Sequence, residues 1–211
     1  IKKLIEEAFT GEKLVLIENE FGEIGIDGGF LKDSGINITE MNSGCICCSL
    51  VGDFGTALAE VLEKYAPDRI IIEPSGVGKL SDVIKAVLGV KEKVAEDSVV
   101  LNSFTTVADA TKCKMYMKNF GEFYNNQVEH AGTIVLSRTG NMKEDKLQAC
   151  IDLIRTQNAE ASIITTPWDQ INGKQILDAM EKKNDLVKEL LEEEDVCPEC
   201  GHHHEHGEEC D

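Results

Sequence analysis

Short apolar segments alternate with amphipathic helical segments along most of this chain, and no other feature of the sequence restricts the fold as strongly. The clearest apolar segment is Arg69–Glu73, where three consecutive isoleucines precede Pro74. An uninterrupted apolar run that ends at turn residues is typical of a strand buried on both faces of a parallel sheet. Strands that alternate with helices form such sheets with helices on both faces, so we predict an α/β fold.

Periodicity and turn residues assign the other elements. Helices are predicted for residues 1–9, 53–65, 81–88, 112–130 with a break near Gly121, 144–157 and 176–194. Strands are predicted for residues 13–18, 37–40, 69–73, 98–109, 133–136 and 162–165. A polar, Gly-rich loop rich in carboxylates is predicted for residues 19–29.

The composition excludes two classes of partner. The chain holds 39 Asp and Glu against 21 Lys and Arg, for a net charge of −18, whereas binding to nucleic acids or anionic membranes requires basic patches. The sequence has no apolar run of about 18 residues that could span a membrane, and its start does not resemble a signal peptide. Its eight cysteines are clustered, which in an α/β protein of the cytoplasm indicates metal binding or thiol chemistry rather than disulfides.

Three of these cysteines, Cys45, Cys47 and Cys48, lie within four residues. Thiolates are soft metal ligands, and three so close together would repel each other unless a cation compensates their charge. Cys45 and Cys47 point to the same side of an extended segment, and a turn at Cys48 can bring the third sulfur to about 2.3 Å from the same Zn²⁺. The fourth position could be open, as suits a carrier, or filled by Glu18 or Glu23.

Two other interpretations of this cluster are open. Cys45 and Cys48 have the C-x-x-C spacing of thiol redox proteins, although Cys47 and the lack of a Gly-Pro spacer make the motif a poor match. The three side chains could also simply pack in a core. Cys113, Cys150 and His130 are interpreted as structural residues.

The C-terminal residues form a second group of metal ligands. Cys197-Pro198-Glu199-Cys200-Gly201 has the form of a metal knuckle, in which a tight turn directs two sulfurs at one ion. The further ligands of this tail are His202, His203, His204, His206 and Cys210. Imidazole and thiolate together suit Zn²⁺, Co²⁺ or Ni²⁺. The acidic run that precedes the tail is interpreted as a solvated helix end.

An acidic residue also ends the clearest strand, at Glu73-Pro74-Ser75-Gly76. Ligands of open α/β sheets bind at the carboxyl ends of the strands. In proteins that transfer phosphoryl groups, an acid at this position contacts Mg²⁺ or its water, and a following glycine lets the backbone approach a γ-phosphate.

Three motifs, in their order and spacing, resemble those of the CobW-type GTPases: Glu18-Asn19-Glu20-Phe21-Gly22-Glu23, Gly44-Cys45-Ile46-Cys47-Cys48 and Glu73-Pro74-Ser75-Gly76. That family belongs to the P-loop class of metallochaperone GTPases that includes HypB and UreG, and the resemblance covers most of residues 1–170. It implies a P-loop NTPase-like three-layer sandwich with a mainly parallel sheet. It also implies that GTP is bound and hydrolysed with Mg²⁺, and that this is coupled to loading or release of Zn²⁺, Co²⁺ or Ni²⁺ at the cysteines.

The resemblance also implies roles for single residues. Glu73 takes the Mg²⁺-side role of the Walker B acid and is the expected catalytic residue. The expected nucleotide-binding residues are Asn19, Glu20, Gly76, Arg138 and Thr139. Many members of the family carry His-rich segments, as this chain does in its tail.

Two departures from the family pattern change what we expect of this chain. A G-x-x-G-x-G-K-[ST]-[ST] loop should stand just before the helix at Ile1, and both the loop and the central strand before it are lacking. A sheet without its central strand would have a gap lined by unpaired backbone groups, which is energetically costly. We therefore expect that this chain is an N-terminally truncated domain, which hydrolyses GTP poorly by itself. In addition, Gly140 stands where the family has the Asp that reads guanine, which predicts a relaxed preference for guanine over adenine unless Asn141 substitutes. The last base-contacting loop is expected at residues 165–168.

We therefore predict a nucleotide-binding domain at residues 1–180, an acidic helix at 181–196 and a metal-binding tail at 197–211. The predicted function is that of a GTP-dependent metallochaperone, which delivers a transition metal to a client metalloprotein or to an enzyme of metal-cofactor biosynthesis. A nucleotide-dependent homodimer is a further expectation. The alternatives are a non-enzymatic metal buffer or scaffold with a degenerate nucleotide site and, from a third class, a thiol redox protein.

Overall fold

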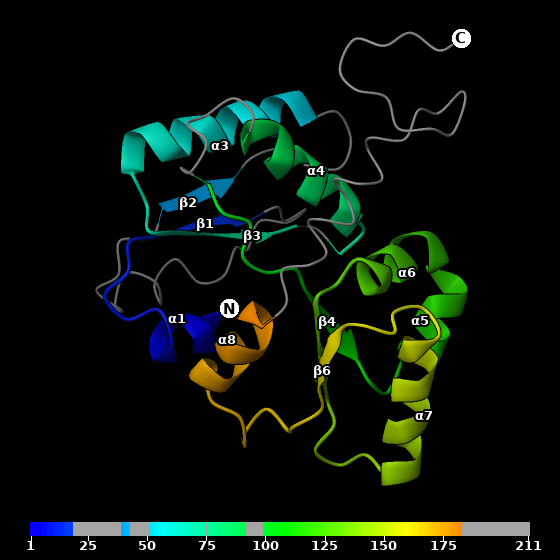
Figure 1. Cartoon of the computed structure of the whole chain (residues 1–211). Coiled ribbons are helices and arrows are strands. Elements are labelled where there is room, and N and C mark those ends of the chain that lie inside the picture. The colour runs from blue at the N-terminus through cyan, green and yellow to red at the C-terminus, as the bar shows by residue number, and fades with distance from the viewer. Residues whose placement is uncertain (19–38, 43–50, 75, 92–98, 183–211) are drawn as a thin grey trace, which may run out of the picture.

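A computed structural model of the chain describes residues 1–18, 39–42, 51–74, 76–91 and 99–182 (Figure 1). Its helices are α1 (Lys2–Glu7), α3 (Val51–Tyr65), α4 (Leu80–Lys91), α5 (Cys113–Asn119), α6 (Gly121–Glu129), α7 (Glu144–Arg155) and α8 (Gly173–Glu181). Its strands are β1 (Leu14–Glu18), β2 (Thr39–Asn42), β3 (Arg69–Glu73), β4 (Thr105–Asp109), β5 (Thr133–Ser137) and β6 (Ser162–Ile164). None of the helices in these segments is long and apolar enough to cross a bilayer.

The described strands are all parallel to their neighbours, and they form two sheets, with the orders β2-β1-β3 and β4-β5-β6. The predicted α/β fold is thus confirmed. The strands do not join into one sheet, because no described segment pairs with the outer side of β3 or of β4.

Several element boundaries differ from the predicted ones; β2 and α4, for example, end at Asn42 and Lys91 rather than at residues 40 and 88. Strand β4 begins at Thr105 rather than at residue 98, because only Thr105–Asp109 pairs with β5. The long predicted helix is divided into α5 and α6 at Phe120, next to the predicted break. Helix α8 begins three residues before the predicted start, because Asn172 forms a capping box: its Oδ1 accepts from the Gln175 N–H at 2.8 Å, and its own N–H donates to Gln175 Oε1 at 3.0 Å.

Helices α1 and α8 cover one face of both sheets and so hold the sheets together. Their core cluster joins side chains of β1, β5 and β6 to side chains of the two helices: Leu14, Leu16, Val135, Ile164, Leu4, Ile5 and Ile176. Lys3 of α1 binds the segment that leads into α8, since its Nζ donates to the carbonyls of Trp168 and Ile171 at 2.6 Å each. Gly173 lets the helices approach, because a Cβ there would lie 2.6 Å from the Lys3 carbonyl oxygen.

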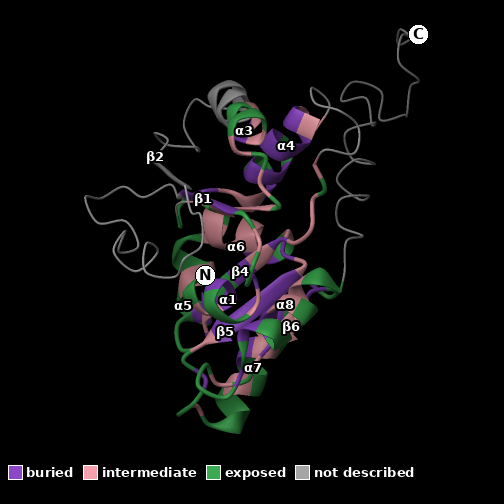
Figure 2. Cartoon of the chain, turned by 90° about the vertical axis from the view of Figure 1, so that its left-hand side faces the viewer, coloured by how far each residue is buried: buried purple, intermediate pink, exposed green. Residues whose placement is uncertain are grey.

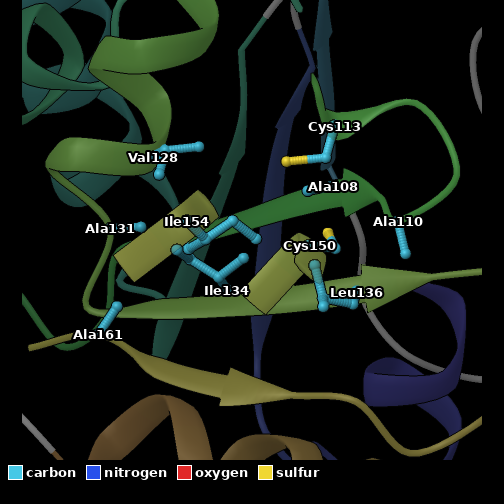
Figure 3. Packing of buried hydrophobic residues seen from close by; sticks show 10 residues of the cluster. All are labelled: Ala108, Ala110, Cys113, Val128, Ala131, Ile134, Leu136, Cys150, Ile154 and Ala161. Atoms are coloured by element: carbon cyan, nitrogen blue, oxygen red, sulfur yellow. The ribbon is translucent and has the colours of Figure 1, made fainter. Parts of the chain in front are cut away.

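The opposite faces carry the other helices, which completes three layers. Side chains alternate along a strand, so Val15 and Ile17 of β1 face away from α1 and pack in a cluster with α3 and α4. Helices α5, α6 and α7 cover the second sheet in the same way, over Ala108 of β4 and Ile134 and Leu136 of β5 (Figure 3). Figure 2 shows that β5 is buried along its length except at its last residue, Ser137, which is partly exposed.

Arg69, at the start of β3, adds polar contacts between the first sheet and α8. Its guanidinium lies 2.7 Å from Glu12 and 3.2 Å from Glu181, and it stacks 4.5 Å from the centre of the Phe9 ring. Asn102, in the segment before β4, donates to the same Glu181 carboxylate at 2.7 Å. One carboxylate therefore connects β3, α8 and the approach to the second sheet.

We predict that Gly173→Ala lowers the free energy of unfolding by about 1–3 kcal/mol, because the methyl group must push the backbone of α1 away. Gly89→Ala in α4 is the matched control: a Cβ there meets nothing within 4 Å, so it should be neutral or stabilise by up to about 1 kcal/mol. Urea unfolding of both variants measures the difference, and equal effects would contradict the close approach of α1 and α8.

Candidate nucleotide and metal site

The carboxyl ends of β2, β1 and β3 lie side by side at one edge of the first sheet. In the register of the strands, Glu18 of β1 stands between Asn42 of β2 and Glu73 of β3. The acidic loop that starts at Asn19 therefore leaves the sheet beside Glu73, and the cysteine segment that starts after Asn42 leaves it one strand further along the same edge.

Most of the predicted metal ligands lie outside the described residues. These are Glu23, Cys45, Cys47, Cys48, Cys197, Cys200, His202, His203, His204, His206 and Cys210. The predicted nucleotide-binding residues Asn19 and Glu20 also lie outside them. For Glu18 the structure gives only the backbone position. Within the described segments, no group of three or more His, Cys, Asp or Glu side chains could hold a metal ion.

The loop after β3 contains Gly76, the residue predicted to approach a γ-phosphate. A Cβ on Gly76 would meet no atom within 4 Å in the described part of the chain, so there is space beside this residue. The Gly76 carbonyl accepts from Gln127 Nε2 at 3.0 Å, and the Gly78 carbonyl accepts from the same nitrogen at 2.7 Å. The position of this loop is therefore set from α6.

The predicted base-binding residues follow β5 and lie next to Asp109, the last residue of β4. Asp109 Oδ1 accepts from the N–H and the hydroxyl of Thr111 at 2.9 and 2.6 Å, and Arg138 Nε lies 3.4 Å from Asp109 Oδ2. Burial disfavours the charged form of Asp109, but the Thr111 hydrogen bonds and then the charges of Arg138 and Lys112 outweigh it and hold the pKa of this carboxyl below its usual value. Asp109 is therefore ionised at neutral pH.

Arg138 and Thr139 have the features of a ligand-binding turn. Arg138 has φ = 61°, a left-handed conformation that is uncommon and costly for a residue with a side chain. Thr139 is 6% exposed, and its buried hydroxyl has no hydrogen-bond partner among the described residues. Such an orphaned buried hydroxyl fits the hydrogen bond of a ligand.

The next residue, Gly140, lies against the predicted last base-contacting loop. A Cβ at Gly140 would lie 3.7 Å from Cβ of Pro167, an ordinary contact, and the φ of Gly140 is not in the left-handed region. The turn after β5 thus lies against residues 165–168, where Trp168 is 52% exposed. Gly140 itself offers no carboxylate, as the departure in the sequence indicates.

The two described cysteines, Cys113 and Cys150, lie in the core under α5 and α7 (Figure 3). Their thiols interact: a hydrogen bond with Cys150 lowers the pKa of Cys113, and the same contact together with burial raises the pKa of Cys150. His130 Nδ1 lies 3.0 Å from the Asn126 carbonyl oxygen at the end of α6. These positions agree with the structural interpretation of all three residues.

Sequence reasoning missed the residues that support this site, among them Lys3, Asp109, Asn126 and Gln127. Their partners are far away in the sequence, such as Gly76, which is 51 residues from Gln127. Asn158 is a similar case, since its buried side chain bonds the carbonyls of Val128 and Ala131 at 2.9 and 2.8 Å. Of these residues, only Asp109 could have been found from the sequence, because it lies at the end of a predicted strand.

Comparison with known proteins gives one matching domain family and several relatives. The domain described as "CobW/HypB/UreG, nucleotide-binding domain" matches residues 1–165. A zinc chaperone CobW of Sinorhizobium sp is 30% identical over 100% of this chain and 65% of its own length. The zinc chaperone YeiR of Escherichia coli is 26% identical over 82% of this chain and 52% of its own length.

A solved structure supports the fold. The Zn(II)-bound YjiA GTPase of E. coli superposes with a TM-score of 0.61 at 20% identity, over 88% of this chain and 59% of that one. The chain thus has the P-loop NTPase-like fold predicted from its sequence. It spans about half to two thirds of the length of these relatives.

Proposed function

Because the chain belongs to the CobW/HypB/UreG family of nucleotide-binding domains, we propose that it is the nucleotide-binding part of a GTP-dependent metallochaperone whose cargo is zinc. The observation that carries this proposal is the row of strand ends at Asn42, Glu18 and Glu73. This row puts the start of the cysteine segment on the same sheet edge as Glu73, the acid expected on the Mg²⁺ side, with Glu18 between the two. A nucleotide bound there would lie beside the cysteine segment.

In this proposal, different described residues hold Mg²⁺, the terminal phosphate and the base of GTP. Glu73 is the acid on the Mg²⁺ side, and the backbone at Gly76 faces the terminal phosphate. Arg138 and Thr139 form the wall for the base, with the Thr139 hydroxyl as a donor or acceptor. Bound Mg²⁺ supplies the positive charge that stabilises the phosphate oxygens during hydrolysis.

The cargo site in this proposal is Cys45, Cys47 and Cys48, with Glu18 or Glu23 as a fourth ligand. Three thiolates bind zinc tightly, and a fourth position that can open allows transfer to a client. The names of these relatives, both zinc chaperones, favour zinc, whereas the ligand set by itself also accepts Co²⁺ and Ni²⁺. The tail at 197–211 raises the local zinc concentration near the site.

The partners proposed for this protein follow from its cargo. A client metalloprotein or an enzyme of metal-cofactor biosynthesis accepts the metal, in the cytoplasm. A relative in Dictyostelium discoideum, 22% identical over 79% of this chain, is called a zinc-regulated GTPase metalloprotein activator. A homodimer that forms with bound nucleotide is part of the same proposal.

A second candidate function is a metal buffer without enzymatic activity. One observation favours it: Gly140 leaves the base wall without the carboxylate that reads guanine. The buffer would hold zinc with equal affinity whether or not nucleotide is present.

We predict that Co²⁺ added to the full-length protein produces thiolate-to-metal absorption, and that Cys47→Ser removes most of the part contributed by the cysteine segment, because one of its three sulfur ligands is lost. Cys200→Ser, which changes the tail alone, is the matched control and should keep the absorption of the cysteine segment. Absorption unchanged by Cys45→Ser, Cys47→Ser and Cys48→Ser together would show that the tail is the metal site and would refute the proposed cargo site.

We predict that Gly140→Asp raises the preference for GTP over ATP by about 10- to 100-fold, the effect of a hydrogen bond to a charged group. The backbone can accept the side chain, since the new Cβ meets only Pro167 at 3.7 Å. Gly140→Ala adds the same Cβ without the carboxylate and should leave the preference unchanged. Competition of GTP and ATP for a fluorescent nucleotide measures the ratio, and equal ratios in both variants would contradict the proposed base wall.

A further inference from the structure

Helix α6 is attached along one face to the segment that follows β3. Glu122 lies 2.9 Å from Lys79 Nζ, and Asn126 Oδ1 accepts from the N–H and the hydroxyl of Ser81 at 3.3 Å each. Asn126 Nδ2 returns a hydrogen bond to the Ser81 hydroxyl at 3.0 Å. With Gln127, three polar side chains of this one helix hold residues 76–81.

Gln127 makes the most specific of these contacts. Its amide nitrogen carries two protons, and these reach two carbonyls of the same loop, Gly76 at 3.0 Å and Gly78 at 2.7 Å. In a trans peptide the N–H points opposite to the C=O. Fixing the two carbonyls toward α6 therefore also fixes the direction of the N–H groups of Val77 and Lys79, which point away from α6.

The other side of α6 is fixed to the second sheet. Val128 is fully buried in the cluster under β4 and β5, and the backbone carbonyl of Gln127 accepts from Thr106 Oγ1 at 2.6 Å. Asn158 binds the carbonyls of Val128 and Glu129 at 2.9 Å each. Gln127 thus connects the loop after Glu73 to a rigid part of the molecule.

We propose that Gln127 is a positioning residue of the nucleotide site, which holds the loop after Glu73 ready for a terminal phosphate and so sets the preference for nucleoside triphosphate over diphosphate. This inference rests on the proposed GTP-dependent function. A loop that is already ordered does not lose conformational entropy when the ligand binds. Only a triphosphate places a phosphate at Gly76, so only its affinity gains from the ordered loop.

Two variants separate this role from a general effect on folding. Gln127→Ala removes both donors but keeps the Thr106 contact, which uses the backbone carbonyl. Gln127→Glu keeps the size of the side chain but turns carboxylate oxygens toward two carbonyl oxygens. The matched control is Gln148→Ala on α7, where the amide donates to Asp152 on the same helix at 2.8 Å.

The experiment measures binding of GTPγS and GDP to the full-length protein by calorimetry, and hydrogen exchange of residues 76–81 without nucleotide. We expect both Gln127 variants to exchange faster in this segment and to bind GTPγS about tenfold more weakly, the effect of two hydrogen bonds of ordinary strength, while GDP affinity changes less than about twofold. Gln148→Ala should behave as the wild type in both measurements.

An unchanged GTPγS-to-GDP ratio in the Gln127 variants of a protein that binds both nucleotides would overturn the inference alone. Unchanged exchange in residues 76–81 would also overturn it, whether or not nucleotide binds. A wild-type protein that binds neither GTPγS nor GDP would instead overturn the proposed function, and with it the role of Gln127 in nucleotide preference.

Discussion

The packing of α1 against α8 is the contact on which the rest of the described structure depends, because the strands form two sheets rather than one. Both sheets bury side chains against this helix pair, and Gly173 allows the backbones to meet. Burial of this kind contributes about 25 cal/mol per Å² of apolar surface. The Glu181 carboxylate and the contacts of α6 with residues 76–81 add polar links between the same two sheets.

The candidate residues lie at or just after the carboxyl ends of strands in both sheets. The first sheet contributes Glu73 and the starts of the acidic loop and the cysteine segment, and the second contributes the turn at Arg138 and Thr139. Helix α6 contacts both sheets, since Gln127 bonds Gly76 after β3 through its side chain and Thr106 of β4 through its backbone carbonyl. The affinity for a ligand that contacts both Gly76 and the turn at Arg138 and Thr139 would therefore depend on the relative position of the two sheets.

The sequence predicted the strands and helices well, because apolar runs and 3.6-residue periodicity are local properties. Arg69–Glu73 was predicted residue for residue, and the break near Gly121 was found. The start of α8 was missed because its capping box depends on Asn172 and Gln175 rather than on the apolar stripe. Gln127 could not be predicted, since a polar residue on a helix gives no sign of carbonyls that lie 49 and 51 residues away. The cysteine segment and the tail were predicted from composition and spacing and lie outside the described residues, so their assignment as ligands stays a prediction.

The central claim is that bound nucleotide controls the affinity for zinc. Its most direct test is to measure the zinc dissociation constant of the full-length protein with GTPγS and with GDP, each with Mg²⁺. Competition with a chromophoric chelator gives both constants. Coupled sites change each other's affinity by equal factors. The account predicts that the two constants differ by at least about fivefold, and that the difference disappears when Cys45, Cys47 and Cys48 are all serine. Equal zinc affinity in both nucleotide states would contradict the proposed coupling and would favour the second candidate function, a metal buffer.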